Sequence, residues 1–248
     1  MKNWTMKNLA LRLFAFTAFL LIGAGAMAQG GASPYVNSTH TYTATPQSGG
    51  NTLSWTVTGG TATDYTITNG TTAAATILWK TAGTYTVTFK ETSGNSCFTE
   101  RTIGVTVTAN LFDLAVTAPS DFCATIAPNA AAPNPTTVVF NVAVAGNTAK
   151  ASTFDYTLTG DDHIASVAFS DGITATSIMG AAGVTIPSGV ASFTVTVVVN
   201  SVIADEDTIA FGISNAKDFY NTPENNTANN SGDAVIWAVP NTSPITAD

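Results

Sequence analysis

Acidic side chains gather in two runs in the C-terminal half of this 248-residue chain, and they are its best candidates for metal chemistry. One run is Asp161 and Asp162, and the other is Asp205, Glu206 and Asp207. Ca²⁺ takes six to eight hard oxygen ligands from carboxylates and carbonyls. If the loops that carry the runs meet at one end of a fold, they can form a weak calcium site of the extracellular type. The alternative is two solvated loops whose like charges keep them exposed, in which case the chain needs no cofactor.

Catalytic side chains lack the partners that they would need. The two histidines are isolated, His40 near the N-terminal region and His163 beside Asp162. A nucleophile or general base must have a partner within hydrogen-bond reach, and neither histidine lies near a Gly-x-Ser-x-Gly or His-Glu-x-x-His pattern. We therefore expect no enzyme activity and assign no catalytic residue.

The two cysteines, Cys97 and Cys123, leave two interpretations open. In an exported protein they can form one disulfide, which would join the first half of the chain to the second. The alternative is a pair of free thiols. Zinc chemistry has no support, because two cysteines and two isolated histidines lack the spacing of zinc ligands.

Aromatic side chains divide into core and surface candidates. Trp55 and Trp79 have the parity of a buried strand face, and Trp237 is also predicted to be packed. Phe219 and Tyr220 lie in a polar segment, so they are the aromatic pair that we expect to contact a sugar or a partner protein. Planar rings on a sandwich surface are typical of such contacts.

The elements that position these residues are predicted to be strands. Thr alternates with large apolar residues from Ser54 to Val107. A period of two predicts strands with one buried and one solvated face. The same alternation recurs downstream without a helical period, which favours an all-β fold of two tandem antiparallel β-sandwiches of the Ig-like type. Predicted strands are Leu53–Thr58, Asp64–Thr68, Ala74–Trp79, Thr84–Glu91, Cys97–Val107 (broken near Glu100), Phe112–Val116, Thr137–Ala145, Ser152–Leu158, Ile164–Phe169, Ile173–Ile178, Ser192–Val199, Thr208–Ile213 and Ala234–Val239.

A secretory leader precedes the sandwiches. Lys2, Lys7 and Arg12 come before the apolar run Leu13–Ile22, and Ala26-Met27-Ala28 is a small-residue cleavage site. The run is too short for a membrane span, so we expect no transmembrane segment after cleavage. The predicted organisation is a signal peptide at 1–28, an extended lead-in at 29–50 with room for one edge strand, sandwiches at 51–108 and 111–240, and a polar tail at 241–248.

Charge excludes some partners. The chain has 8 basic and 16 acidic residues, and three of the basic ones lie in the leader, which leaves five against sixteen, a net charge of −11, after cleavage. Nucleic acids and anionic lipid surfaces bind basic patches. We therefore expect neither as a partner.

The first predicted sandwich resembles the PKD-like (polycystic-kidney-disease-type) Ig domain of exported Bacteroidota proteins. The resemblance covers Asn51–Thr108 and rests on Trp-Thr-Val-Thr-Gly-Gly from Trp55, Gly-Thr-Tyr-Thr-Val-Thr from Gly83, a Gly-Asn-Ser-Cys turn and a final Val-Thr-Val. Members of that family are usually spacer or adhesion modules, so the resemblance implies such a role.

The second predicted sandwich resembles Calx-β-type sandwiches over Thr137–Asn215. Asp155-Tyr156, the step Ile186-Pro187-Ser188-Gly189 and the run from Asp205 carry the likeness. Asn200 and Ser201 stand where that family has paired aspartates, which counts against calcium binding. In addition, Asp207-Thr208-Ile209 resembles the O-glycan acceptor motif of exported Bacteroidota proteins, which makes Thr208 a candidate acceptor.

Together these observations predict an exported, non-enzymatic protein with a structural, adhesive or protein-interaction role. We expect it at the cell surface, outside the cell or in the periplasm, with an envelope or surface protein as partner. Two alternatives remain open: a carbohydrate-binding module for polysaccharide capture, with a glycan as partner, and a calcium-stabilised adhesin.

Overall fold

The structure is a computed structural model that describes residues 31–124, 135–160, 164–174, 177–199 and 206–237. All regular secondary structure in these ranges is β-strand, and the strands form four sheets. Within the same ranges we find no helix of the length and apolarity that a membrane crossing requires. The predicted all-β sandwich fold is confirmed.

The first sandwich consists of two three-stranded antiparallel sheets. One sheet has the order β1 (Thr39–Thr43), β4 (Ala74–Trp79) and β3 (Tyr65–Thr68). The other has the order β2 (Thr52–Thr58), β5 (Gly83–Thr92) and β6 (Phe98–Val107). Because apolar residues alternate with Thr in these strands, each sheet has one apolar face, and the two apolar faces pack together.

The core of the first sandwich contains the predicted aromatic residues. Trp79 is fully buried and Trp55 is 8% exposed, which confirms their prediction as core residues. Their indole N–H groups are satisfied: Trp55 Nε1 donates to the Thr72 carbonyl at 2.8 Å and Trp79 Nε1 donates to the Tyr42 hydroxyl at 3.2 Å. The two tryptophans are therefore part of the scaffold and leave no ring face for a ligand.

The second sandwich is larger. Its five-stranded sheet has the order β12 (Gly180–Ile186), β10 (Ser152–Thr159), β14 (Glu206–Lys217), β15 (Ser231–Trp237) and β8 (Phe122–Cys123). Its four-stranded sheet has the order β11 (Ile164–Phe169), β13 (Ser192–Val199), β9 (Thr136–Ala145) and β7 (Asp113–Thr117). The strand pairs in these two sheets are antiparallel except β15 with β8. A separate apolar core fills the space between them, with Phe140, Phe154, Tyr156, Phe193 and Phe211 among its buried rings.

Several strands differ from their prediction. β1 is an edge strand in the predicted lead-in, which had room for one, but it also contributes to the core, because His40 and Tyr42 point inward and alternate with Thr. β6 is continuous through Glu100, because that carboxylate points to the exposed face and pairs with Lys90 Nζ at 3.4 Å. The described residues of Ile173–Ile178 form no strand, and β12 follows them.

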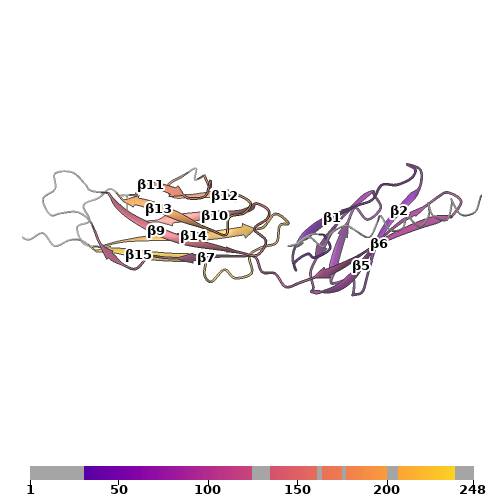
Figure 1. Ribbon diagram of the computed structural model, residues 1–248, viewed down its shortest axis with the longest axis horizontal. Coiled ribbons are helices and arrows are strands. Elements are labelled where there is room, and N and C mark those ends of the chain that lie inside the picture. The colour runs from indigo at the N-terminus through magenta and orange to yellow at the C-terminus, as the bar shows by residue number, and fades with distance from the viewer. Residues whose placement is uncertain (1–30, 125–134, 161–163, 175–176, 200–205, 238–248) are drawn as a thin grey trace, which may run out of the picture.

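The two sandwiches lie end to end, joined by the segment between β6 and β7 (Figure 1). Asn110 in that segment holds the loop that follows β14. Its Nδ2 donates to the Pro223 carbonyl at 2.6 Å, and its own carbonyl accepts from Asn225 Nδ2 at 2.7 Å. The connection is therefore hydrogen-bonded to the second sandwich.

Candidate functional site

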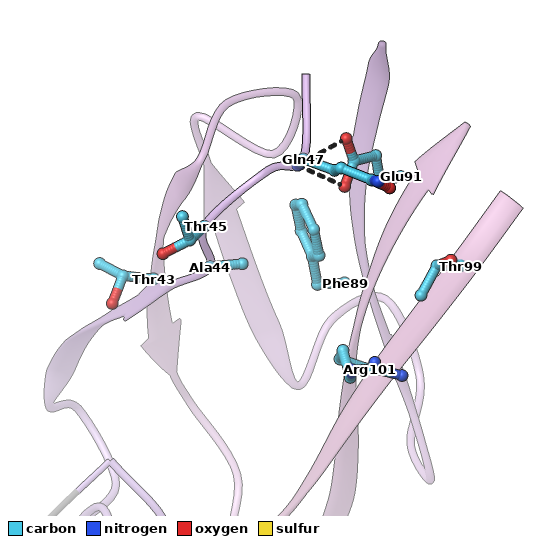
Figure 2. Close-up of a pocket in the computed structure, with 8 residues that line it drawn as sticks. All are labelled: Thr43, Ala44, Thr45, Gln47, Phe89, Glu91, Thr99 and Arg101. Carbon is cyan, nitrogen blue, oxygen red and sulfur yellow. Dashed lines mark hydrogen bonds between the residues drawn. The ribbon is translucent and has the colours of Figure 1, made fainter. Parts of the chain in front are cut away.

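A groove runs along the open side of the first sandwich, between β1 and β6. Two adjoining hollows of about 460 and 320 Å³ form it, and they share Thr43, Ala44, Phe89 and Arg101. Figure 2 shows the Phe89 ring standing between the segment that follows β1 and strand β6. We call this feature the β1–β6 groove.

Buried aromatic rings form the floor of the β1–β6 groove. Phe89 is 5% exposed and packs against Trp55 with ring centroids 4.9 Å apart and the ring planes tilted by 52°. Phe89 belongs to β5 and Trp55 to β2, at directly opposed positions of one sheet. Such cross-strand aromatic pairs stabilise a sheet, so the floor is a fixed apolar surface.

Glu91 closes one end of the β1–β6 groove but is not free to bind a ligand. Its carboxylate accepts hydrogen bonds from Gln47 N at 2.9 and 3.0 Å, from Ser48 N at 3.2 Å and from Asn51 Nδ2 at 2.6 Å. The bonds to Gln47 are drawn in Figure 2. The amide of Asn51 and these backbone N–H groups hold the Glu91 pKa below its ordinary value. The carboxylate is thus a structural anchor for the segment after β1.

Arg101 supplies the positive charge of the β1–β6 groove. Its exposed guanidinium donates through Nη1 to the carbonyl of Glu100 at 3.2 Å. Within the described ranges it forms no ion pair, whereas the nearby Lys90 pairs with Glu100 on the other face of the sheet. The guanidinium is therefore available to a carboxylate from outside the chain.

A second site of interest is the contact between the two sandwiches. Thr39 N in β1 donates to the Tyr220 carbonyl at 2.9 Å, and the His40 and Tyr220 rings stack with centroids 4.1 Å apart. His40 Nε2 lies 3.0 Å from Ser38 Oγ, which itself donates to the Tyr35 carbonyl at 2.6 Å. Because the Ser38 proton is used in that bond, the imidazole is the donor to Ser38. Burial lowers the His40 pKa from 6.5 to about 4.

The predicted ligand pair Phe219 and Tyr220 is divided between two environments. Phe219 is 57% exposed, and Lys150 Nζ lies 5.3 Å from the centre of its ring. Tyr220 is half-buried against His40. Tyr220 therefore serves a contact within the chain, and Phe219 alone presents a ring to solvent.

The predicted calcium residues are only partly described. Asp161, Asp162 and Asp205 lie outside the described residues, as does His163. Glu206 is exposed at the start of β14, and Asp207 is 8% exposed with no hydrogen-bond partner for Oδ2 in the described structure. Across the described ranges, no group of three or more His, Cys, Asp or Glu side chains is placed to hold a metal ion.

The remaining predicted positions are all exposed. Cys97 precedes β6 and Cys123 ends β8, so they belong to different sandwiches, and the structure has both as free thiols. Thr208 is exposed in β14, opposite Val235 of β15. Trp237, predicted to be packed, is 46% exposed because it has the opposite parity to the fully buried Ala234 and Ile236 of β15.

The β1–β6 groove was not predicted from the sequence. Arg101 and Ile103 have the inward parity of the buried Val105, so alternation alone would place them in the core. They are exposed because the opposite sheet ends at β1. Arg101 is a charged residue at a position where alternation predicts a buried apolar side chain. Such a residue is the signal that could have indicated that the opposite sheet does not cover this position.

No family model matches the chain, and no curated protein matches it. Among solved structures, the fibronectin type III-like modules of Clostridium thermocellum CbhA are 11% identical, with 90% of this chain and 97% of that chain covered and a TM-score of 0.34. The Yersinia pseudotuberculosis adhesin InvE is 13% identical (84% and 56% covered, TM-score 0.29), and the S. aureus collagen adhesin CNA is 12% identical (84% and 90% covered, TM-score 0.25). Likeness at this level identifies neither a function nor a partner for the chain.

Proposed function

We propose that the chain is an exported, non-enzymatic protein of the cell envelope or surface, with a structural, adhesive or protein-interaction role. The observation that carries this proposal is the β1–β6 groove, which has a floor of packed aromatic rings and, on a sheet edge, a guanidinium with no ion pair among the described residues. Surface edges of this kind mediate binding between proteins. The leader at 1–28 supports export, and the motifs around Trp55 and Gly83 support a PKD-like first sandwich.

Cell fractionation tests this function directly. The protein, expressed with its own leader in a Bacteroidota host, should lose the leader and be found in the envelope or the medium. Biotinylation of intact cells then separates surface from periplasmic protein. Recovery of the protein in the cytoplasm with the leader intact would reject the proposal, whatever the groove binds.

Glycan binding is the second candidate, and the exposed Phe219 ring favours it. The planar ring can stack on a sugar, and the Lys150 ammonium beside it can donate hydrogen bonds to the sugar hydroxyls. Polysaccharide retention in affinity electrophoresis should then be lost in Phe219→Ala. Equal migration of the two proteins on every polysaccharide tested would reject this role.

Calcium stabilisation is the third candidate, and the unpaired Oδ2 of Asp207 next to Glu206 is the described feature that supports it. A ligand that binds the native state raises its melting temperature by mass action. Millimolar Ca²⁺ should therefore raise the melting temperature relative to chelator, and Asp207→Asn should abolish the difference. An unchanged melting temperature would show that the chain works without this cofactor.

A further inference from the structure

Strand β6 is covered along only part of its outer edge. The segment at 32–36 pairs with its C-terminal end in parallel: Thr106 N donates to the Ala32 carbonyl, Thr108 N donates to the Pro34 carbonyl, and Val36 N donates to the Thr108 carbonyl, at 2.9–3.0 Å. The stretch Phe98–Gly104 has no such neighbour in the described structure, and every residue in it is exposed. One part of this edge therefore already accepts a strand, and the other part is open.

Backbone groups along the open stretch point outward with a defined period. Since Thr106 and Thr108 direct their N–H groups to the outer neighbour, alternate residues before them do the same. Glu100, Thr102 and Gly104 therefore present N–H and carbonyl groups away from β5. The carbonyl of Glu100 is capped by the Arg101 guanidinium. An added strand would replace that cap and release the guanidinium.

Side chains on the inner face of the same stretch are also uncovered. Thr99, Arg101 and Ile103 share the parity of Val105, which is 1% exposed, yet Ile103 is 42% exposed. A strand added to the open edge of β6 would place alternate side chains beside Arg101 and Ile103 on the inner face. An extended polypeptide would therefore fit both the open edge and the exposed apolar surface beside it.

Charge further specifies this occupant. Glu91 is saturated by its N–H donors, and Arg101 has no carboxylate partner in the described ranges. We propose that the β1–β6 groove binds an extended segment of a partner protein, which adds as a strand to Phe98–Gly104 and places an acidic side chain opposite Arg101. This inference rests on the proposed function and names the chemistry of the partner.

Two other occupants fit less well. The floor rings of Phe89 and Trp55 are buried, so they offer no open face on which a sugar could stack. A second copy of the chain would pair its β6 antiparallel about a two-fold axis. Two-fold pairing about Glu100 or Arg101 would set that residue opposite its own copy, and like charges directly opposite are unfavourable. Pairing about Thr102 or Ile103 avoids this repulsion, so fewer registers suit a second copy.

Peptide display on the whole protein tests the proposal. A library of nine-residue segments should yield binders with alternating apolar residues and one Asp or Glu. Arg101→Glu should weaken the enriched peptides by about tenfold or more, whereas Lys80→Glu, the same charge change at an exposed position outside the groove lining, should leave their affinity unchanged.

Backbone modification then identifies strand addition. N-methylation of alternate peptide residues should abolish binding in one register and spare it in the other, because only one edge of the peptide pairs with β6. On binding, the amides of Glu100, Thr102 and Gly104 should gain protection from hydrogen exchange.

The proposal is overturned if no peptide is enriched, if binding survives Arg101→Glu, or if both N-methylated registers bind equally. Binding of glycans alone at this groove, or a concentration-dependent dimer that Arg101→Glu dissociates, would also overturn it. Failure here would leave the fractionation result unaffected, so the groove proposal and the proposed export can fail separately.

Discussion

At the residue scale, single polar side chains fix the positions of whole segments. Glu91 binds the backbone after β1 through two N–H groups and the Asn51 amide. Asp155 similarly accepts from Gly183 N and Asn215 Nδ2, both at 2.7 Å, where β10 shifts register against β12 and β14. Amide donors, chiefly Asn215 and Gly183, hold the Asp155 pKa below its ordinary value. Charged residues make up 10% of the chain, and these two carboxylates bind other parts of the same chain.

His40 should make the stability of the first sandwich depend on pH. Its pKa falls from 6.5 in the unfolded chain to about 4 in the folded chain. Between these values the unfolded state binds more protons, so stability is complete above pH 6.5 and declines as pH falls toward 4. We expect a loss on the order of 2 kcal/mol by pH 5.

Urea unfolding at pH 7 and at pH 5 measures this effect. His40→Phe keeps an aromatic ring against Tyr220 but cannot be protonated, so its stability should change less over the same range. Carboxylates with lowered pKa contribute mainly below pH 4.5. Burial raises the pKa of Glu224, but this group is the same in both proteins, so the difference between them reports His40. Identical pH dependence in the two proteins would contradict the prediction.

At the element scale, the turn after β2 requires a glycine. Gly59 has φ +100, and a Cβ added there would lie 2.6 Å from the Thr84 carbonyl oxygen. These two backbones lie close together because the pairing of β2 with β5 extends to Thr58 and Thr86. Few residues other than glycine adopt this backbone conformation, and none fits the space.

Gly59→Ala should therefore lower the free energy of unfolding by about 2 kcal/mol through backbone strain and the clash with Thr84. Gly49→Ala is the matched control, because nothing lies within 4 Å of its added Cβ. Its effect should be within about 0.5 kcal/mol. Chemical denaturation of both variants checks the difference, and equal stability would contradict this account of the turn.

Much of the first sandwich could be predicted from alternation, because parity places Trp55 and Trp79 in its core. Alternation cannot show how far the opposite sheet extends, so it missed the exposure of Arg101 and Ile103. Likewise Phe219 and Tyr220 are adjacent in a polar loop, and only the packing of the second sandwich against His40 distinguishes them. Local sequence is enough to predict which segments form strands. The candidate site, in contrast, depends on how far the opposite sheet extends.

At the scale of the whole molecule, the contact between the sandwiches determines their relative orientation. The Thr39–Tyr220 hydrogen bond and the His40–Tyr220 stack lie on one side of the connection. The bonds of Asn110 to Pro223 and Asn225 hold the connecting segment itself. Loop residues of the second sandwich therefore take part in both sets of contacts. We expect these contacts to restrict the motion of the two sandwiches relative to each other.

Tyr220→Ala should broaden the distribution of orientations without unfolding either sandwich. Spin labels on the exposed Cys97 and Cys123, one in each sandwich, report the distance between them. Phe219→Ala is the matched control, because that ring points to solvent and should leave the distance distribution narrow. Equal distributions for Tyr220→Ala and wild type would contradict the role of this contact. Failure of either thiol to label would indicate the disulfide instead.

The short parallel ladder between residues 32–36 and the end of β6 has a mechanical consequence. The chain enters the ladder at its N-terminal side and leaves for the second sandwich at the C-terminal end of β6. Tension on the two ends of the protein would pull these parallel strands past each other along their length. Their hydrogen bonds would then bear the load together in shear and would not peel apart one by one. In a chain that spans two anchored points, this ladder would therefore resist extension of the first sandwich.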